Sequence, residues 1–85
     1  MEYIIVSFRS RSETVKFSDL LNKRGIGNAI ISTPKEASVG CGLSVRISPN
    51  YFEMAKRLVF ANGFSSFAGF FQIKSYGGKR IVRSI

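Results

Sequence analysis

Short apolar segments and stretches of helical spacing alternate along this chain of 85 residues. Four segments are rich in β-branched and aromatic residues, which favour strands. Two other stretches place apolar residues three and four positions apart, which is the spacing of one helix face. The predicted strands are Tyr3–Phe8, Asn28–Thr33, Leu43–Ile47 and Phe67–Lys74. The segments therefore follow the order strand, helix, strand, strand, helix, strand.

Capping residues mark both ends of each predicted helix. Ser10-Arg11-Ser12-Glu13 matches a capping box, in which a hydroxyl accepts from a first-turn amide and the acid reaches back. Ser48-Pro49 is a typical start for the second helix. Gly25 and Gly63 supply the left-handed residue that follows a helix end. The side chains expected to be among the most buried are Leu20, Val45 and Leu58.

This order of elements predicts an α+β fold of the ferredoxin-like, split βαβ type. An antiparallel sheet of four strands would carry two helices on one face and leave the other face open. Arg80–Arg83 is a candidate extra C-terminal strand, because Tyr76-Gly77-Gly78-Lys79 before it is a turn signal. We expect residues 1–85 to form a single domain, since so short a chain supports only one core.

The open face of the predicted sheet should carry aromatic side chains. The chain has eight Phe residues, and the alternation of a strand must direct some ring of Phe67, Phe70 and Phe71 towards that face. Such a face would join two copies of the chain or stack against a ligand, unless a loop or tail folds over it.

Charge and residue types exclude several classes of function. Thirteen Lys and Arg against five Asp and Glu give a formal net charge of +8, which attracts phosphates, acidic proteins or anionic membranes. The absence of His excludes imidazole catalysis and His-ligated metals. A single Cys cannot form an internal disulfide or a thiolate cage, and the five acids are scattered. We therefore expect no metal, no cofactor and no self-sufficient hydrolase.

The thiol of Cys41 is the one conspicuous reactive group. Gly40 and Gly42 flank it, which frees its approach and permits backbone angles that point amides towards an anion. Lys35 and Arg46 are the nearest cations by position and would stabilise a thiolate. A lone thiolate without a general base accepts a sulfur atom better than it hydrolyses a bond. The same spacing also suits a small buried hydrophobe in a glycine turn.

Two neighbouring motifs around this cysteine point to a family. Thr33-Pro34-Lys35-Glu36, followed by Gly40-Cys41-Gly42-Leu43-Ser44-Val45-Arg46, resembles the selenium/sulfur carrier family, short bacterial domains with a Pro-basic pair and a Cys-Gly-Leu step. The resemblance covers about the first half of the chain. It implies that Cys41 holds a persulfide or selenosulfide between a donor, such as a cysteine desulfurase, and an acceptor. It further implies access and anion-binding roles for Gly40 and Gly42, with Lys35 and Arg46 as charge partners.

Two other functions stay open at this stage. The basic charge and the sheet aromatics would suit an RNA-binding module that stacks bases on an open sheet face. Phe67-Ala68-Gly69-Phe70-Phe71 loosely matches the glycine-aromatic rhythm of such modules, although it lies on a different strand. The third function is a non-catalytic one, in which the Phe-rich face forms a homodimer or binds another subunit.

The first residues give no sign of a targeting segment. Glu2 stands where a signal peptide has its basic region, and the apolar run after it is short. No stretch approaches the roughly 18 apolar residues of a membrane span. The free thiol fits a reducing compartment. We expect a cytoplasmic protein that does not enter a membrane.

Overall fold

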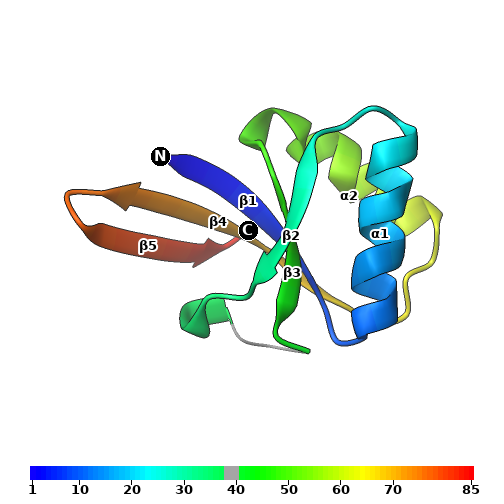
Figure 1. Ribbon diagram of the computed structural model, residues 1–85, viewed down its shortest axis with the longest axis horizontal. Helices are drawn as coiled ribbons and strands as arrows, with labels where there is room; N and C mark the ends of the chain where they lie inside the picture. Colours follow the sequence, from blue (N-terminus) through cyan, green and yellow to red (C-terminus); the bar gives the residue numbers. More distant parts are fainter. Residues whose placement is uncertain (38–40) are drawn as a thin grey trace.

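The computed structural model describes residues 1–37 and 41–85 of the chain. Within these residues five strands form one antiparallel sheet in the order β2-β3-β1-β4-β5 (Figure 1). The strands are β1 (Glu2–Phe8), β2 (Asn28–Ser32), β3 (Leu43–Ile47), β4 (Phe67–Tyr76) and β5 (Lys79–Ser84). The helices are α1 (Arg11–Lys23) and α2 (Phe52–Ala61), with short 3-10 turns η1 (Lys35–Ala37) and η2 (Pro49–Tyr51). The α+β class, the two helices and the antiparallel sheet are confirmed.

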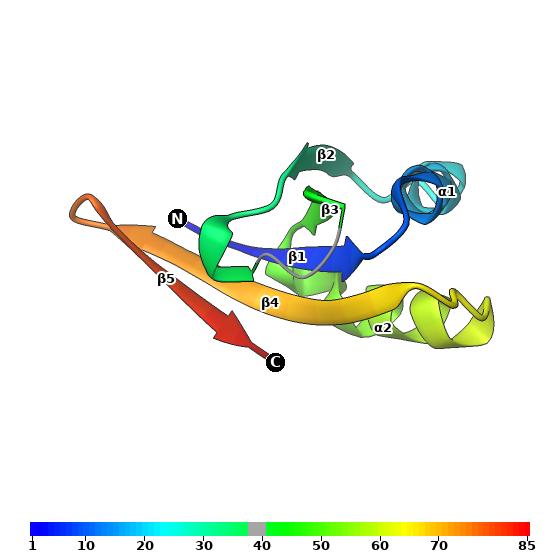
Figure 2. The same ribbon diagram turned by 90° about the horizontal axis from the view of Figure 1, so that it is seen from below.

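The sheet has five strands rather than four, because the candidate C-terminal strand pairs with β4 along its whole length. The β4–β5 hairpin extends away from both helices, as Figure 2 shows. Within the part of the chain that the structure describes, neither helix is long and apolar enough to cross a membrane.

The start of α1 follows its predicted cap only in part. Ser10 Oγ accepts from the Glu13 N–H at 3.3 Å, as a capping residue should. The Glu13 carboxylate does not reach back to the cap. It accepts instead from the backbone N–H of Ser66 at 2.8 Å and from the Ser66 hydroxyl. The Ser10 N–H donates to Ser66 Oγ at 3.2 Å. This part of the capping-box prediction is wrong, because a tertiary contact takes the acid.

The main core lies between the sheet and the two helices, which cover the same face (Figure 1). Six of the eight Phe rings belong to it. Val45 and Leu58 are buried at 0% and 5% exposure, as predicted. Leu20 is only half-buried, because it lines a groove between α1 and the end of α2. Gly25 and Gly63 follow the helix ends with φ of 72° and 62°, which confirms both predicted exits.

The second face of the sheet is covered in part by η1, so the face is not open and the alternative, in which a loop folds over its aromatic side chain, fits the structure. Ala37 of η1 is buried together with Ile5 and Ile73. Phe71 packs against this small cluster and is half-buried, whereas Phe67 and Phe70 belong to the core beneath the helices. The rings that are exposed belong to other positions, with Phe60 at 65% and Tyr76 at 61%.

Candidate functional site

Cys41 lies between the first turn of α1 and the start of β3. Its side chain is exposed, so the interpretation of a buried hydrophobe is wrong. The Cys41 Sγ is 3.8 Å from Thr14 Oγ1 and 3.7 Å from the Leu43 carbonyl oxygen. The thiol is therefore reachable from solvent while its position is fixed by two neighbouring elements.

Thr14 links the sulfur to the N-terminal end of α1. Its hydroxyl is buried and donates to the Ser10 carbonyl oxygen at 3.1 Å. The Thr14 hydroxyl oxygen also lies within reach of Cys41 Sγ, and in that pair either atom can donate. The first turn of a helix carries partial positive charge, because its N–H groups lack partners within the helix. Cys41 thus lies at the end of α1 where negative charge is favoured.

Gly42 gives the Cys41 loop its return into β3. Its φ is +88°, a left-handed conformation that residues with a Cβ rarely adopt. The Gly42 carbonyl oxygen accepts from the Thr33 N–H at 2.8 Å, which closes this end of the loop. Gly40, the other predicted access residue, lies outside the described residues.

Three hydroxyl groups form a chain beneath this loop. Thr33 Oγ1 lies 2.6 Å from Ser44 Oγ, which lies 2.9 Å from Ser7 Oγ. Ser44 points away from the helices, as the alternation predicts, but it is fully buried together with Ser7. Buried hydroxyls need partners, and each of these has one. The chain therefore joins the residue that follows β2 to β3 and β1.

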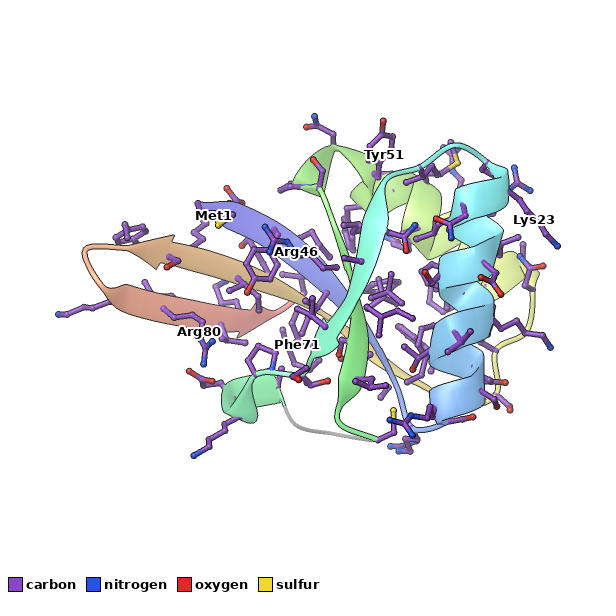
Figure 3. The ribbon with its side chains drawn as sticks, viewed as in Figure 1. Met1, Lys23, Arg46, Tyr51, Phe71 and Arg80 are labelled. Atoms are coloured by element: carbon purple, nitrogen blue, oxygen red, sulfur yellow. The ribbon has the colours of Figure 1, made fainter. Side chains whose placement is uncertain are left out.

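Neither predicted cation is joined to the thiol among the described residues: Arg46 has contacts of its own, and Lys35 is exposed. The Arg46 guanidinium covers the Tyr3 ring at 4.2 Å, and its Nη2 is 3.9 Å from Met1 Sδ (Figure 3). Lys35 is exposed on η1, whose Glu36 forms an ion pair with Arg80 at 3.1 Å. Within residues 1–37 and 41–85, no hydrogen bond or ion pair joins either cation to Cys41.

Two carboxylates have lowered pKa values for different reasons. Hydrogen bonds from the side chain and backbone of Ser66 hold the pKa of Glu13 below its usual 4.5. The pKa of Glu36 is lowered first by a hydrogen bond from the backbone N–H of Glu36 itself, and then by the hydrogen bond and charge of Arg80. Glu13 precedes Thr14 directly, so its contact with Ser66 anchors the turn of α1 that faces Cys41. Among the residues that the structure describes, no group of three or more His, Cys, Asp or Glu is placed to hold a metal ion.

Sequence reasoning proposed Cys41 and Gly42 for the candidate site but did not indicate Thr14 or the hydroxyl chain. Thr14 stands 27 positions before Cys41, and no local pattern relates the two. The sequence signal for Ser44 was only that a small polar residue stands on the sheet face away from the helices, which does not indicate a buried hydroxyl.

Comparison with known proteins gives one match. No curated protein and no solved structure matches the chain. The family described as "Putative Se/S carrier protein-like" matches residues 2–68, a segment that includes Cys41 and extends through α2 into the first residues of β4. The resemblance seen in the first half of the sequence thus continues into the second helix. Because the match spans most of its length, the chain belongs to the Se/S carrier protein-like family.

Proposed function

We propose that Cys41 carries sulfur or selenium transiently between a donor protein, such as a cysteine desulfurase, and an acceptor. The carried atom would be held as a persulfide or selenosulfide. One observation carries this proposal: in a chain of this family, the single thiol is exposed at the first turn of α1. The free thiol suits a carrier that works in the cytoplasm, where thiols stay reduced.

The loading step is an exchange between sulfur atoms that needs no oxidant. The Cys41 thiolate attacks the outer sulfur of a persulfide on the donor cysteine. The bond between the two donor sulfurs breaks, the donor thiolate leaves, and Cys41 keeps the outer sulfur as its own persulfide. Delivery reverses these roles: a nucleophile of the acceptor takes the outer sulfur, and the Cys41 thiolate is the leaving group. With an outer selenium atom the same exchange yields a selenosulfide.

The surroundings of Cys41 support this exchange through hydrogen bonding and partial charge. The Thr14 hydroxyl can donate to the Ser10 carbonyl oxygen while the sulfur is protonated, and to the sulfur once it is ionised. A persulfide anion on Cys41 would lie near the positive end of α1. We assign Thr14 as a positioning residue on this basis.

The other predicted roles belong to the same proposal. Gly42, and Gly40 with it, would keep the approach to the sulfur free for the active site of a second protein. Lys35 and Arg46 remain predicted charge partners, although Arg46 packs on Tyr3 and Lys35 is exposed on η1, which favours α1 for that role. The strand order β2-β3-β1-β4 supports our interpretation of a ferredoxin-like, split βαβ layout to which β5 is added.

The decisive experiment measures sulfur on the intact protein. The reduced chain is incubated with a cysteine desulfurase and cysteine, and we expect a mass gain of about 32 Da, one sulfur atom. Cys41→Ser should show no gain. Thr14→Val, which keeps the shape and removes the hydroxyl, should slow loading without abolishing it.

The control for exposure alone is the double variant Cys41→Ser, Asn50→Cys. It moves the single thiol to an exposed position of η2, beyond the opposite end of β3 from Cys41. If this variant loads as fast as the wild type, the site around Cys41 contributes nothing. If the wild type gains no sulfur from any donor while its thiol reacts with iodoacetamide, the carrier proposal is wrong.

A further inference from the structure

The two outer edges of the sheet differ in charge. β5 forms one edge and has three cations in six residues, Lys79, Arg80 and Arg83. Charges of this kind are a common protection of an edge strand against pairing with another chain. β2 forms the other edge, and its sequence Asn-Ala-Ile-Ile-Ser has no charged residue and no proline. Only the β2 edge therefore lacks electrostatic protection.

The pairing register shows which backbone groups of β2 point outward. The Thr33 N–H donates to the Gly42 carbonyl oxygen, so these opposite residues form a hydrogen-bonded pair. The register continues through Ser32 opposite Leu43 to Asn28 opposite Ile47. Hydrogen-bonded pairs alternate in an antiparallel ladder, so Ala29 and Ile31 bond inward to β3. The backbone groups of Asn28, Ile30 and Ser32 consequently point away from the sheet.

Apolar side chains flank this edge. Ile30 is 40% exposed on β2, and Val15 is 42% exposed on α1. Val15 lies on the side of α1 that faces β2, because Ser18 and Asn22, three and seven positions later, both bond to Asn28. An exposed Ile and an exposed Val thus lie beside an uncharged row of outward donors and acceptors.

We propose that the β2 edge binds the β2 edge of a second copy of this chain in antiparallel register. With Ile30 opposite Ile30 of the other copy, each Asn28 lies opposite a Ser32, and the outward groups form six hydrogen bonds. The paired strands themselves bring no charged side chains together. The same pairing through β5 would bring six cations together, which disfavours it. The proposal is independent of the chemistry of Cys41.

The contact is small, so the dimer should be weak. Two five-residue strands and their flanking side chains bury less than the roughly 1,200 Å² of stable, specific interfaces. Sedimentation equilibrium on the Cys41→Ser chain, from about 20 μM to about 1 mM, covers the corresponding range of dissociation constants. We expect the average mass to rise from 9.4 kDa towards twice that value as the concentration increases.

A matched pair of variants and one local measurement identify the surface. Ile30→Lys should weaken association at least tenfold, whereas Ile81→Lys on β5, at a site of similar exposure, should leave it unchanged. Amide exchange of the wild type needs no variant: the Ile30 N–H should gain protection with concentration, and the outward Val82 N–H should not. A chain that stays monomeric at about 1 mM would overturn the proposal. The proposal would also be overturned by a dimer that persists in Ile30→Lys, or by a dimer in which the Ile30 N–H gains no protection from exchange.

Discussion

Glu13 shows how a single carboxylate can leave a local motif for a distant contact. The capping box predicts a bond within the first turn of α1, but Ser66, 53 positions later, supplies two donors to the carboxylate. Two donors bind an ionised acid more strongly than one N–H, and the Ser10 N–H bonds to Ser66 instead, so the tertiary contact is preferred. The end of α1 beside Cys41 is thereby fixed to the loop before β4.

This contact predicts a pH dependence of stability. The pKa of Glu13 is lower in the folded chain than its usual 4.5, so the folded state binds fewer protons there. The stabilisation is complete above that usual value and is lost as pH falls through the lower folded pKa. Glu13→Gln should be less stable than wild type at neutral pH, and the two should converge below about pH 4.5.

Urea unfolding followed at a series of pH values measures this difference. Glu53→Gln is the control, since Glu53 is an exposed acid of α2 whose nearest cation, Lys56, lies 3.9 Å away on the surface. It should differ little from wild type throughout. A gap between Glu13→Gln and wild type that stays constant from neutral to acid pH would contradict the assigned role.

The same scale explains which site residues the sequence could indicate. The sequence indicates Cys41 because it is the only thiol. It indicates Gly42 because a glycine beside Cys41 permits a left-handed backbone conformation, which Gly42 adopts. Arg46 is predicted as a charge partner of Cys41 because the two are close in sequence, but an extended strand advances about 3.3 Å per residue. β3 therefore carries the Arg46 side chain to Tyr3 rather than back to the thiol.

Among the elements, α2 was the one predicted most completely. Its glycine exit and its apolar stripe follow local rules that sequence spacing reveals. Ser48-Pro49, predicted as its start, instead begins η2, and α2 itself begins at Phe52 without a side-chain cap. The loop between β2 and β3 has no such period, so nothing in the sequence indicated that η1 would cover the second face. The sequence therefore left open whether a loop covers that face, because burial by an irregular loop leaves no pattern.

Leu58 tests the contribution of α2 to the core. It is 5% exposed and packs with Phe70 and Val59 in the main cluster. Leu58→Ala should reduce the free energy of unfolding by about 2–5 kcal/mol, through lost apolar burial and the cavity left behind. Met54→Ala, on the same helix at 42% exposure, should change it by less than about 1 kcal/mol. Equal losses in the two variants, measured by urea titration, would show that α2 is loosely packed.

For the whole molecule, the family match ends two residues into β4, although β4 pairs with the central strand β1. A chain that ends at Ala68 would expose one side of β1 and would lose Phe70 and Ile73 from the two clusters. We expect it to lack the native circular dichroism and to aggregate. A chain that ends at Tyr76 keeps β4 and should fold without β5. A folded, monomeric Ala68 truncation would contradict this dependence.

The position of β1 also sets the order in which the chain can complete its structure. β1 is made first, yet its neighbours in the sheet are β3 and the late strand β4. The bond between Met1 and Ser75 joins positions 74 residues apart. During synthesis β1 can pair with β3 once Leu43–Ile47 has been made, but its second edge stays unpaired until β4 follows. Such long-range closure slows folding, because loop-closure entropy is lost before the contacts form, so the apolar segment Ile4-Ile5-Val6 keeps one edge open until β4 pairs with it.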